Sequence, residues 1–303
     1  MELQPLTERV HVISGPARVG LVRLSGNRVA LIDSGIDGRY GKRILDLLSD
    51  YRYQIVAILN THAHADHIGG NAFIQKATGC RIFLGPLEAP AAMHPIIQAI
   101  ALFGGFPLPD LVNPAIMAEP SIVEILPEKK IVLDEQEIQI LDLPGHSVGQ
   151  KGFLIDGVAF LADALFPTNV VQKNRLIYLF DPLAHIACCE KLRDLHAKWY
   201  VGGHFSPTKS IEAMIAENLG AVEAALHELH SLLATPLPLD KLVKEFLGHF
   251  QIKKRGWEHF LYRATLNGYL SALRRRGEAN FKVFDNLLVW FATVPPDKGQ
   301  TPS

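Results

Sequence analysis

Residues 61–70 read Thr-His-Ala-His-Ala-Asp-His-Ile-Gly-Gly, which places His62, His64, Asp66 and His67 within six positions. Side chains two residues apart on an extended strand end leave the same side of the backbone, so His62 and His64 can converge on one metal ion. Asp66 and His67 then point elsewhere and can bind a second ion nearby. Hydrolytic sites use two adjacent ions to form and hold a hydroxide. The alternative is a polar loop that happens to be rich in histidine, and such a loop has no need for this density of ligands.

Three later segments supply further side chains of the types that bind metals. Leu-Pro-Gly-His146 places a histidine directly after a Pro-Gly turn. An apolar run carries Asp163, whose charge is costly to bury unless it is paired or bound to a metal. Tyr-Val-Gly-Gly-His204 places another histidine at a strand end. Each segment alone fits an ordinary turn or core position equally well, but together and in this order they predict a complete ligand set.

In this order the motifs resemble the metallo-β-lactamase superfamily of binuclear metal hydrolases, over roughly residues 8–210. The resemblance implies three groups of ligands: His62, His64 and His146 for the first ion, Asp66, His67 and His204 for the second, and Asp163 as the bridge between them. It also matches Asp33, at the end of an apolar strand, to an aspartate that supports the ligands from behind. An ordinary turn aspartate before Ser-Gly is the alternative for Asp33.

Within the superfamily the pattern is similar to glyoxalase II-like thioesterases. True β-lactamases of this fold lack a bridging carboxylate at the position of Asp163 and often use cysteine ligands, whereas no cysteine here occupies a ligand position. The sequence departs from the glyoxalase II pattern at Ala162, where glycine is usual, and at Phe205, which begins a Phe-Ser-Pro in place of a polar and aromatic pair. We therefore expect a hydrolase of a thioester, ester or lactone, without a specific assignment to glutathione thioesters.

The expected chemistry depends on two divalent ions that share Asp163 and a solvent oxygen. The ions lower the pKa of that oxygen, so a hydroxide exists near neutral pH and attacks a carbonyl or phosphoryl centre. Asp66, beside the bridging oxygen, can orient this nucleophile and then carry a proton to the leaving group. Histidines on both ions favour zinc, while mixed nitrogen and oxygen ligation also accommodates iron or manganese.

Composition is consistent with a globular enzyme. The 303 residues allow one large or two smaller domains, and 48% hydrophobic content is enough for a sizeable core. The net charge of −1 implies no bulk attraction to polyanions. The odd count of three cysteines predicts buried thiols in a reducing compartment. The amino terminus does not begin with a basic and then apolar stretch, so we expect a cytoplasmic protein. The eight remaining histidines fit no ligand pattern and are expected on the surface.

The distribution of apolar residues predicts an α/β (α+β) fold. Apolar runs at residues 10–13, 19–24, 29–32 and 55–59 indicate strands, and helical spacing at 39–48 and 71–77 indicates helices. Asp156-Gly157 predicts the turn of a hairpin. Strand groups alternating with helices suit two sheets covered by helices, the αββα sandwich that the resemblance implies. We expect residues 1–210 to form this catalytic domain and residues 211–303 a mainly helical C-terminal region.

Residues 89–109 contain no Asp, Glu, Lys or Arg. The length raises the question of a membrane span, but four prolines and a Gly-Gly interrupt the segment too often, so we expect no membrane span. One interpretation is an insert that packs on the core. The other is an apolar lid over the metal cleft that selects the substrate, formed by Met93, Ile97, Leu102, Phe103 and Phe106.

The chain changes character after Pro207. Helical patterns at 211–233, 239–250 and 257–273 are followed by a β-like ending at 281–290, which resembles the small winged-helix-like tail of some superfamily members, including a branch that cleaves single-stranded RNA. Residues 250–303 carry nine Lys or Arg and four Asp or Glu, a balance of +5 that could follow phosphates. A solvated helix face with a homodimer contact is the alternative.

Two classes of function therefore follow from the sequence. The favoured one is a small-molecule hydrolase that attacks a carbonyl and accommodates an apolar part of its substrate beneath residues 89–109. The alternative is a single-stranded nucleic-acid phosphodiesterase that uses the same ions and the basic tail. The two classes differ in whether the tail or the uncharged segment contacts the substrate.

Overall fold

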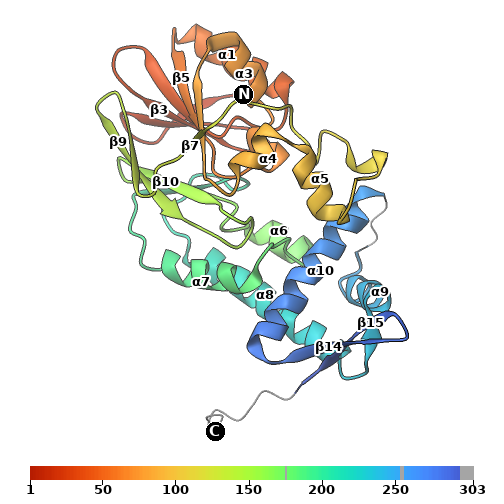
Figure 1. The fold of residues 1–303 in the computed structure, drawn as a ribbon. Helices are drawn as coiled ribbons and strands as arrows, with labels where there is room; N and C mark the ends of the chain where they lie inside the picture. The colour runs from red at the N-terminus through yellow and green to blue at the C-terminus, as the bar shows by residue number, and fades with distance from the viewer. Residues whose placement is uncertain (175, 253–255, 294–303) are drawn as a thin grey trace.

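The computed structural model describes residues 1–174, 176–252 and 256–293, and its centre is a pair of β-sheets (Figure 1). The first sheet runs in chain order and contains β1 (Leu3–Pro5), β2 (Val10–Ile13), β3 (Val19–Arg23), β4 (Arg28–Ile32), β5 (Gln54–Leu59), β6 (Arg81–Leu84) and β7 (Glu124–Ile125). The second has the order β12 (Trp199–Gly202), β11 (Val158–Ala162), β10 (Lys151–Ile155), β9 (Gln136–Asp142) and β8 (Lys130–Leu133). The hairpin predicted at Asp156-Gly157 joins β10 and β11.

The two sheets pack face to face because their strands alternate apolar side chains between the two faces. In β4, Ala30 and Ile32 belong to the core between the sheets, together with Phe153 and Phe160 of the second sheet. Leu31 of the same strand points the other way, into a second core under the outer helices. A sheet that buries both faces needs a helix layer outside it, which is the αββα arrangement expected from the sequence.

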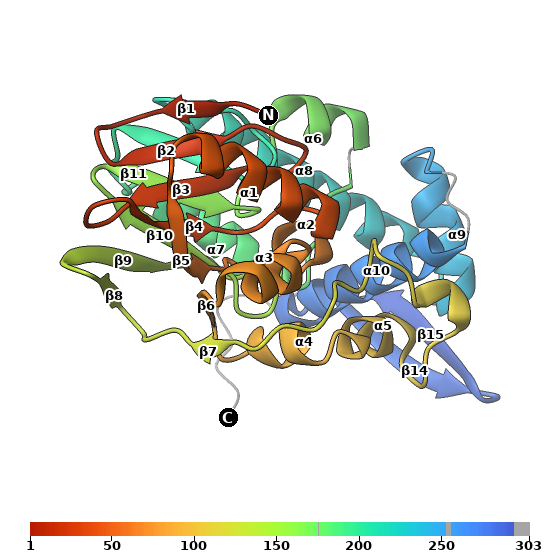
Figure 2. The same ribbon diagram turned by 90° about the horizontal axis from the view of Figure 1, so that it is seen from above.

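Helices cover the outer faces of both sheets (Figures 1 and 2). The first sheet is covered by α1 (Gly38–Asp50) and α3 (Asn71–Thr78), whose Ile44 and Ile74 pack in the outer core. The side chain of Asp37 starts α1 by accepting a hydrogen bond from the backbone N–H of Tyr40 (2.6 Å). The second sheet is covered by α7 (Pro182–Leu192) and α8 (Glu212–Leu232). The sequence patterns predict each of these helices except α7.

The uncharged segment forms α4 (Ala89–Met93), α5 (Ile96–Phe103) and the short 3-10 helix η1 (Pro109–Leu111). Alanines of α4 pack against Ala63 and Ile68, directly beneath the histidine-rich motif. No helix among the described residues is both long and apolar enough to cross a membrane, as the interrupting prolines lead us to expect.

The C-terminal region has the order α8, β13 (Leu237–Pro238), α9 (Leu239–His249), α10 (Trp257–Arg276), β14 (Ala279–Phe284) and β15 (Leu287–Ala292). The three strands form a small sheet in the order β13-β15-β14, so the winged-helix-like extension is confirmed. Its core also contains Phe166, Val171 and Leu179, which precede residue 211. One apolar core therefore joins the two sides of the boundary expected at residue 210.

Candidate metal centre and substrate cleft

The seven expected ligands lie together at one edge of the sandwich, where parallel strands of both sheets end. In the first sheet β4 and β5 are parallel, and the histidine-rich motif follows β5. In the second sheet β11 and β12 are parallel, and Asp163 and His204 follow them. His146 lies in the loop between β9 and β10. Carboxyl ends of parallel strands meet at the same edge of a sheet, so this topology gathers residues that are distant in sequence.

The first ligand set consists of His62, His64 and His146. The Nδ1 atom of His64 lies 2.9 Å from Nε2 of His62 and 2.8 Å from Nε2 of His146. The outer nitrogen of His146 donates to the backbone carbonyl of Tyr178 (3.1 Å), which fixes the ring tautomer and leaves the lone pair of Nε2 facing the centre. Nδ1 of His62 is 3.0 Å from the hydroxyl of Thr61.

The second set consists of Asp66, His67 and His204. Nε2 of His204 is 3.3 Å from Oδ2 of Asp66, and Nε2 of His67 is 3.9 Å from the same oxygen. Asp163 lies between the sets: its Oδ1 is 3.4 Å from His67, and its Oδ2 is 3.3 Å from His204 and 3.5 Å from His146. The ring of His204 is oriented by donating from Nδ1 to the carbonyl of Pro16 (3.2 Å).

Asp33 lies behind this second set and is buried, so it is not an exposed turn residue. It accepts hydrogen bonds from the backbone N–H and the hydroxyl of Thr61 (2.8 and 2.9 Å) and from Nδ1 of His67 (2.8 Å). The last bond leaves Nε2 of His67 as the nitrogen that faces the centre. Asp33 therefore fixes the orientation of the His67 ring.

The donor set fits two divalent ions. Nε2 of His67 and Oδ1 of Asp163 are buried and have no hydrogen-bond partner among the described residues, an arrangement that is costly unless a cation binds there. The ligand atoms fall into three overlapping groups, each with atoms within 4.8 Å of one another: His62 with His64 and His146, His62 with His67 and Asp163, and Asp66 with His67 and His204. Three or four such donors, with a shared carboxylate, are the coordination that adjacent hydrolytic ions require.

Without an ion the two sets differ in charge. Burial lowers the pKa of His62, His64 and His146, the last to about 3, so these imidazoles are neutral. Asp163 instead raises the pKa of His204 to about 10. Burial alone would raise the pKa of Asp163, but the neighbouring His67 and His204 hold it well below its ordinary value.

Backbone shape around the ligands depends on small residues. A Cβ atom on Gly203 would lie 2.3 Å from Oδ1 of Asp163, so this glycine lets the Asp163 carboxylate approach the neighbouring histidines. Ala162 has φ +48, a left-handed conformation that explains why glycine is usual there. Gly69 and Gly70 have ordinary negative φ values but pack against the backbone of Ile36 and Ser34. These two glycines are therefore needed for close approach to neighbouring backbone and not for a left-handed turn.

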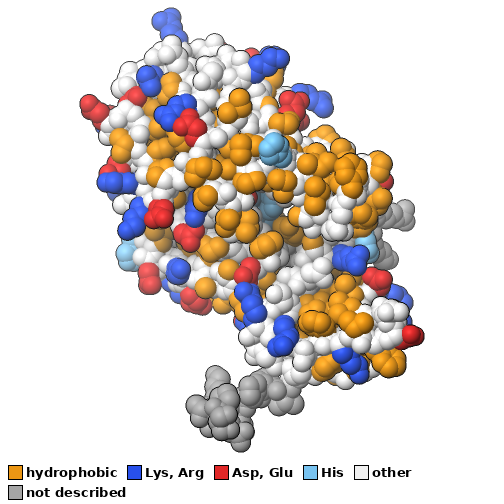
Figure 3. All heavy atoms as spheres, viewed as in Figure 1, with side chains coloured by type: hydrophobic (Ala, Val, Ile, Leu, Met, Phe, Trp, Pro, Cys, Tyr) orange, Lys and Arg blue, Asp and Glu red, His pale blue; other side chains and the backbone are white. Residues whose placement is uncertain are grey.

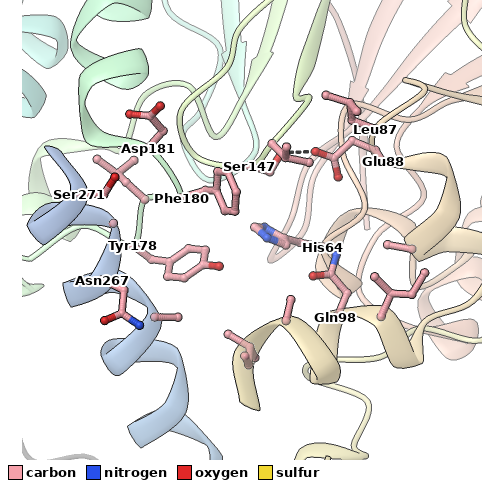
Figure 4. A pocket seen from close by; sticks show the side chains of 18 of the residues that line it. His64, Leu87, Glu88, Gln98, Ser147, Tyr178, Phe180, Asp181, Asn267 and Ser271 are labelled. Carbon is pink, nitrogen blue, oxygen red and sulfur yellow. Dashed lines mark hydrogen bonds between the residues drawn. The ribbon is translucent and has the colours of Figure 1, made fainter. Parts of the chain in front are cut away.

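Two cavities, of about 480 and 540 Å³, open beside the first ligand set and share His64, Gln98, Leu102 and Tyr178 in their walls. The first runs past Glu88 and Ser147 to α10 (Figure 4). The second contains Asp66 and is lined mainly by apolar residues, including Ile116, Trp257 and Leu261. We refer to them as the α10 arm and the Trp257 arm of the cleft.

The uncharged segment lines the cleft through two of the five expected lid residues, Ile97 and Leu102, and through two that were not expected, Gln98 and Ala101. Ile97, Gln98, Ala101 and Leu102 face the α10 arm. Of the expected Met93, Phe103 and Phe106, none is among the lining residues of either arm. Met93 packs beneath the histidine motif, Phe103 contacts Phe260 edge to face, and Phe106 is 86% exposed. Figure 3 shows the apolar side chains gathered over α5 and the loop after it.

The cleft also contains two polar residues that were not predicted from the sequence, Glu88 and Tyr178. Glu88 is the last charged residue before the uncharged segment, which is the one signal that could have singled it out. The ring of Tyr178 lies 5.7 Å from that of His64, and its hydroxyl points into the cleft (Figure 4). Burial and the charge of Glu88 raise the pKa of Tyr178 to about 12, so the phenol stays protonated at neutral pH.

The structure differs from two further expectations, which concern the remaining histidines and the basic C-terminal tail. The remaining histidines are not all at the surface, because His185 of α7 is fully buried and burial lowers its pKa to about 4. In the basic tail, Arg275 pairs with Asp181 (Nη1 to Oδ2, 3.0 Å) and Arg276 with Glu223 (2.8 Å), so these charges are used within the chain. Lys253, Lys254, Arg255 and Lys298 lie outside the described residues.

Comparison with known proteins agrees with this geometry. A sequence profile of the metallo-beta-lactamase superfamily matches residues 14–204. A hydroxyacylglutathione hydrolase of Vibrio parahaemolyticus is 30% identical over 76% of this chain and 81% of the relative. Another, from Shewanella oneidensis, is 33% identical, but the match spans 41% of this chain and 39% of the relative. Several of the curated relatives are thus matched over less than half of their length.

Solved structures extend the likeness to the whole described fold. A metallo-beta-lactamase family protein of Thermus thermophilus has a TM-score of 0.73 and 22% identity, with coverage of 95% of this chain and 100% of that one. A beta-lactamase domain protein of Burkholderia ambifaria has a TM-score of 0.72 at 16% identity, over 96% and 94% of the two chains. At these identities the likeness concerns the fold, including the C-terminal extension.

Proposed function

This chain belongs to the metallo-beta-lactamase superfamily, and from this premise we propose that it is a metal-dependent hydrolase that cleaves an uncharged thioester, ester or lactone with an apolar part. The observation that carries the proposal is the forked cleft beside the seven ligands. Its Trp257 arm offers apolar walls, and its α10 arm adds polar groups such as Gln98 and Asn267. A carbonyl at the fork would lie next to His64.

The charge of the cleft supports an uncharged substrate. The described lining residues of the two arms include Asp37, Asp66, Glu88 and Asp181 but a single cation, Arg275, which already pairs with Asp181. An RNA backbone or the carboxylates of glutathione would find no free positive partner among them. Hydroxyacylglutathione hydrolases are among the curated relatives of this chain, and we propose that it shares their thioester chemistry without their glutathione recognition.

The residues of the chain have distinct roles in this proposal. Two bound divalent ions, for which the histidine-rich ligation supports zinc over iron or manganese, would supply a nucleophilic hydroxide and polarise the carbonyl. Asp66 faces the Trp257 arm and is positioned to orient the nucleophile and to pass a proton to the leaving group. Tyr178, protonated at neutral pH, can donate a hydrogen bond to the substrate from the opposite wall.

The cellular setting remains a proposal. The three cysteines, Cys80, Cys188 and Cys189, are buried and free, which supports a reducing compartment such as the cytoplasm. We propose a small-molecule substrate as the principal partner. A homodimer contact and a nucleic-acid partner stay predictions from the sequence, and the ion pairs of Arg275 and Arg276 favour a structural use of the basic tail.

The test is a turnover screen of metal-loaded protein over acyl thioesters, alkyl esters, lactones, a glutathione thioester and short single-stranded RNA. The expected result is hydrolysis of uncharged carbonyl substrates that disappears in Asp163→Asn, a variant that keeps the size of the side chain but removes the shared charge. Cleavage of RNA with no turnover of any ester would replace this proposal with the nuclease. Preference for the glutathione thioester would refute the argument from charge.

A further inference from the structure

Glu88 is a buried carboxylate that connects the two loops of the first ligand set. It is 2% exposed and precedes α4, outside the histidine-rich motif. Its Oε2 accepts a hydrogen bond from the backbone N–H of Ala63 (3.0 Å), the residue between His62 and His64. Its Oε1 accepts from the hydroxyl of Ser147 (2.7 Å), the residue after His146.

A third bond completes the arrangement. The backbone N–H of Gly149 also donates to Oε1 (2.8 Å), so three donors from two separate loops converge on one carboxylate. The ligand loops belong to different sheets, since one follows β5 and the other precedes β10. Burying an ionised carboxylate is costly, and bonds to charged groups are stronger than bonds between neutral groups. These contacts therefore hold the two loops at a fixed separation.

We propose that Glu88 is a positioning residue for the first metal ion: it presets the distance between the His62–His64 strand end and His146. The proposal rests on the two-ion site proposed above. Asp33 does the corresponding work for the second set, because it bonds His67 directly. The structure thus contains two buried carboxylates behind the expected ligands: Glu88 holds the loops of the first set, and Asp33 contacts His67 of the second set directly. Figure 4 shows the bond between Glu88 and Ser147 beside His64.

Two other roles for Glu88, as a metal ligand or as a packing residue only, agree less well with its contacts. As a metal ligand it would need an oxygen facing the centre, but both of its oxygens already accept bonds from the loops. A role in packing alone would predict a loss of stability without a selective effect on either ion. The distinguishing property is therefore the separate affinity of each ion.

The experiment measures stepwise Co²⁺ binding by absorption spectroscopy, with a chelator as competitor. In Glu88→Ala the affinity of one of the two ions should fall about 10- to 100-fold, the range found when supporting partners of metal ligands are removed. Glu88→Gln keeps an acceptor for Ser147 and Gly149 and should recover part of that loss. Glu137→Ala, which removes an exposed carboxylate of β9, is the matched control and should bind both ions as the wild type does.

Ligand variants identify which ion is affected. In a His204→Ala background, which retains the three-histidine set, Glu88→Ala should still weaken the remaining ion. In a His146→Ala background it should add little, because that set is already broken. Equal affinities in wild type and Glu88→Ala, or an equal loss at both ions that tracks a lower thermal midpoint, would overturn the proposal. A wild-type protein that binds no ions would instead overturn the proposed function itself.

Discussion

At the scale of single residues, the site depends on close approach between atoms that a methyl group would separate. Gly203 lies against the carboxylate of Asp163, and a Cβ atom there would also meet the ring of His67 at 2.7 Å. Neither neighbour can move freely, because His67 is held by Asp33 and Asp163 is buried. The glycine is therefore required by the ligands and not by its own backbone conformation.

We predict that Gly203→Ala displaces Asp163 and lowers the affinity of the second ion by at least tenfold, because the bridge can no longer reach both ligand sets. Gly220 of α8 is the matched control, since no atom lies within 4 Å of a Cβ placed there. Gly220→Ala should leave metal binding unchanged and raise the free energy of unfolding by about 0.5–1 kcal/mol, as expected for this change within a helix. Metal titration and urea denaturation measure the two effects. Full metal affinity in Gly203→Ala would contradict this account.

The buried His185 gives a second prediction at this scale. Its pKa is about 4 in the folded chain against an ordinary value of 6.5, so the unfolded chain binds more protons between these values. The contribution of His185 to the free energy of unfolding is constant above pH 6.5. As the pH falls toward 4 this contribution becomes unfavourable, by up to roughly 3 kcal/mol. His185→Gln does not titrate, so its free energy of unfolding should fall less than that of wild type on acidification. Urea denaturation of both proteins with chelator present tests this, and parallel pH profiles would refute it.

At the scale of elements, α10 is the outer wall of the cleft. Ala264, Asn267, Gly268 and Ser271 present a face of small side chains to the α10 arm. A Cβ on Gly268 would come within 3.0 Å of the carbonyl oxygens of Leu179 and Phe180, so the helix lies close against the loop that carries Tyr178. The C-terminal region thereby sets the width of the substrate cleft.

We predict that Ala264→Leu narrows this arm and raises the KM for long or bulky carbonyl substrates roughly tenfold, a loss of about 1.4 kcal/mol of binding. The kcat for small esters should stay near wild type, because the reacting carbonyl lies at the fork. Arg274→Ala, at an exposed position of α10 outside the lining residues, serves as the control. An equal change for short and long substrates would mean that the arm does not hold the substrate.

The sequence predicts features that depend on a few consecutive residues, but not contacts that form only when distant segments of the chain fold together. The pairs within residues 62–67 are visible because their geometry depends on a few consecutive residues. The contacts of Glu88 could not be foreseen, because its three donors come from two loops that only the folded sandwich brings together. Ile97 and Leu102 line the cleft as expected, but Met93, Phe103 and Phe106 do not, because apolar content shows that α5 packs against something but not which face does so. For α7, the Asp181-Pro182 start was a usable signal, since Asp181 caps the helix and Pro suits its first turn.

At the scale of the whole molecule, the catalytic and C-terminal regions share one core. Leu176, Ile177 and Leu179 pack with Leu226, Phe246 and Leu270. The ion pair Arg275–Asp181 crosses the same junction, whereas Arg276–Glu223 joins α10 to α8 within the C-terminal region. The boundary at residue 210 marks a change in the sequence pattern, but the hydrophobic core continues across it.

We predict that residues 1–210 alone do not form a stable domain, because truncation exposes the apolar residues of this shared core. The measurements are circular dichroism, limited proteolysis and metal content of the fragment beside the full chain. As a control, Arg275→Ala in the full chain removes one ion pair but keeps the core, and should cost about 1 kcal/mol or less, as for exposed pairs. A fragment with native-like cooperative unfolding and two bound ions would refute the prediction.

The expected ligands lie between the two sheets, so bound ions would affect how the protein unfolds. One bound ion would join His62 and His64 of the first sheet to His146 of the second, and the other would join Asp66 and His67 to His204. Each ion would thus act as a crosslink that closes a long loop, as a disulfide does in other proteins. Binding to the folded state alone also adds stability by mass action. Removing the ions should therefore shorten the lifetime of the folded chain, so that turnover of the protein in the cell would follow the supply of metal.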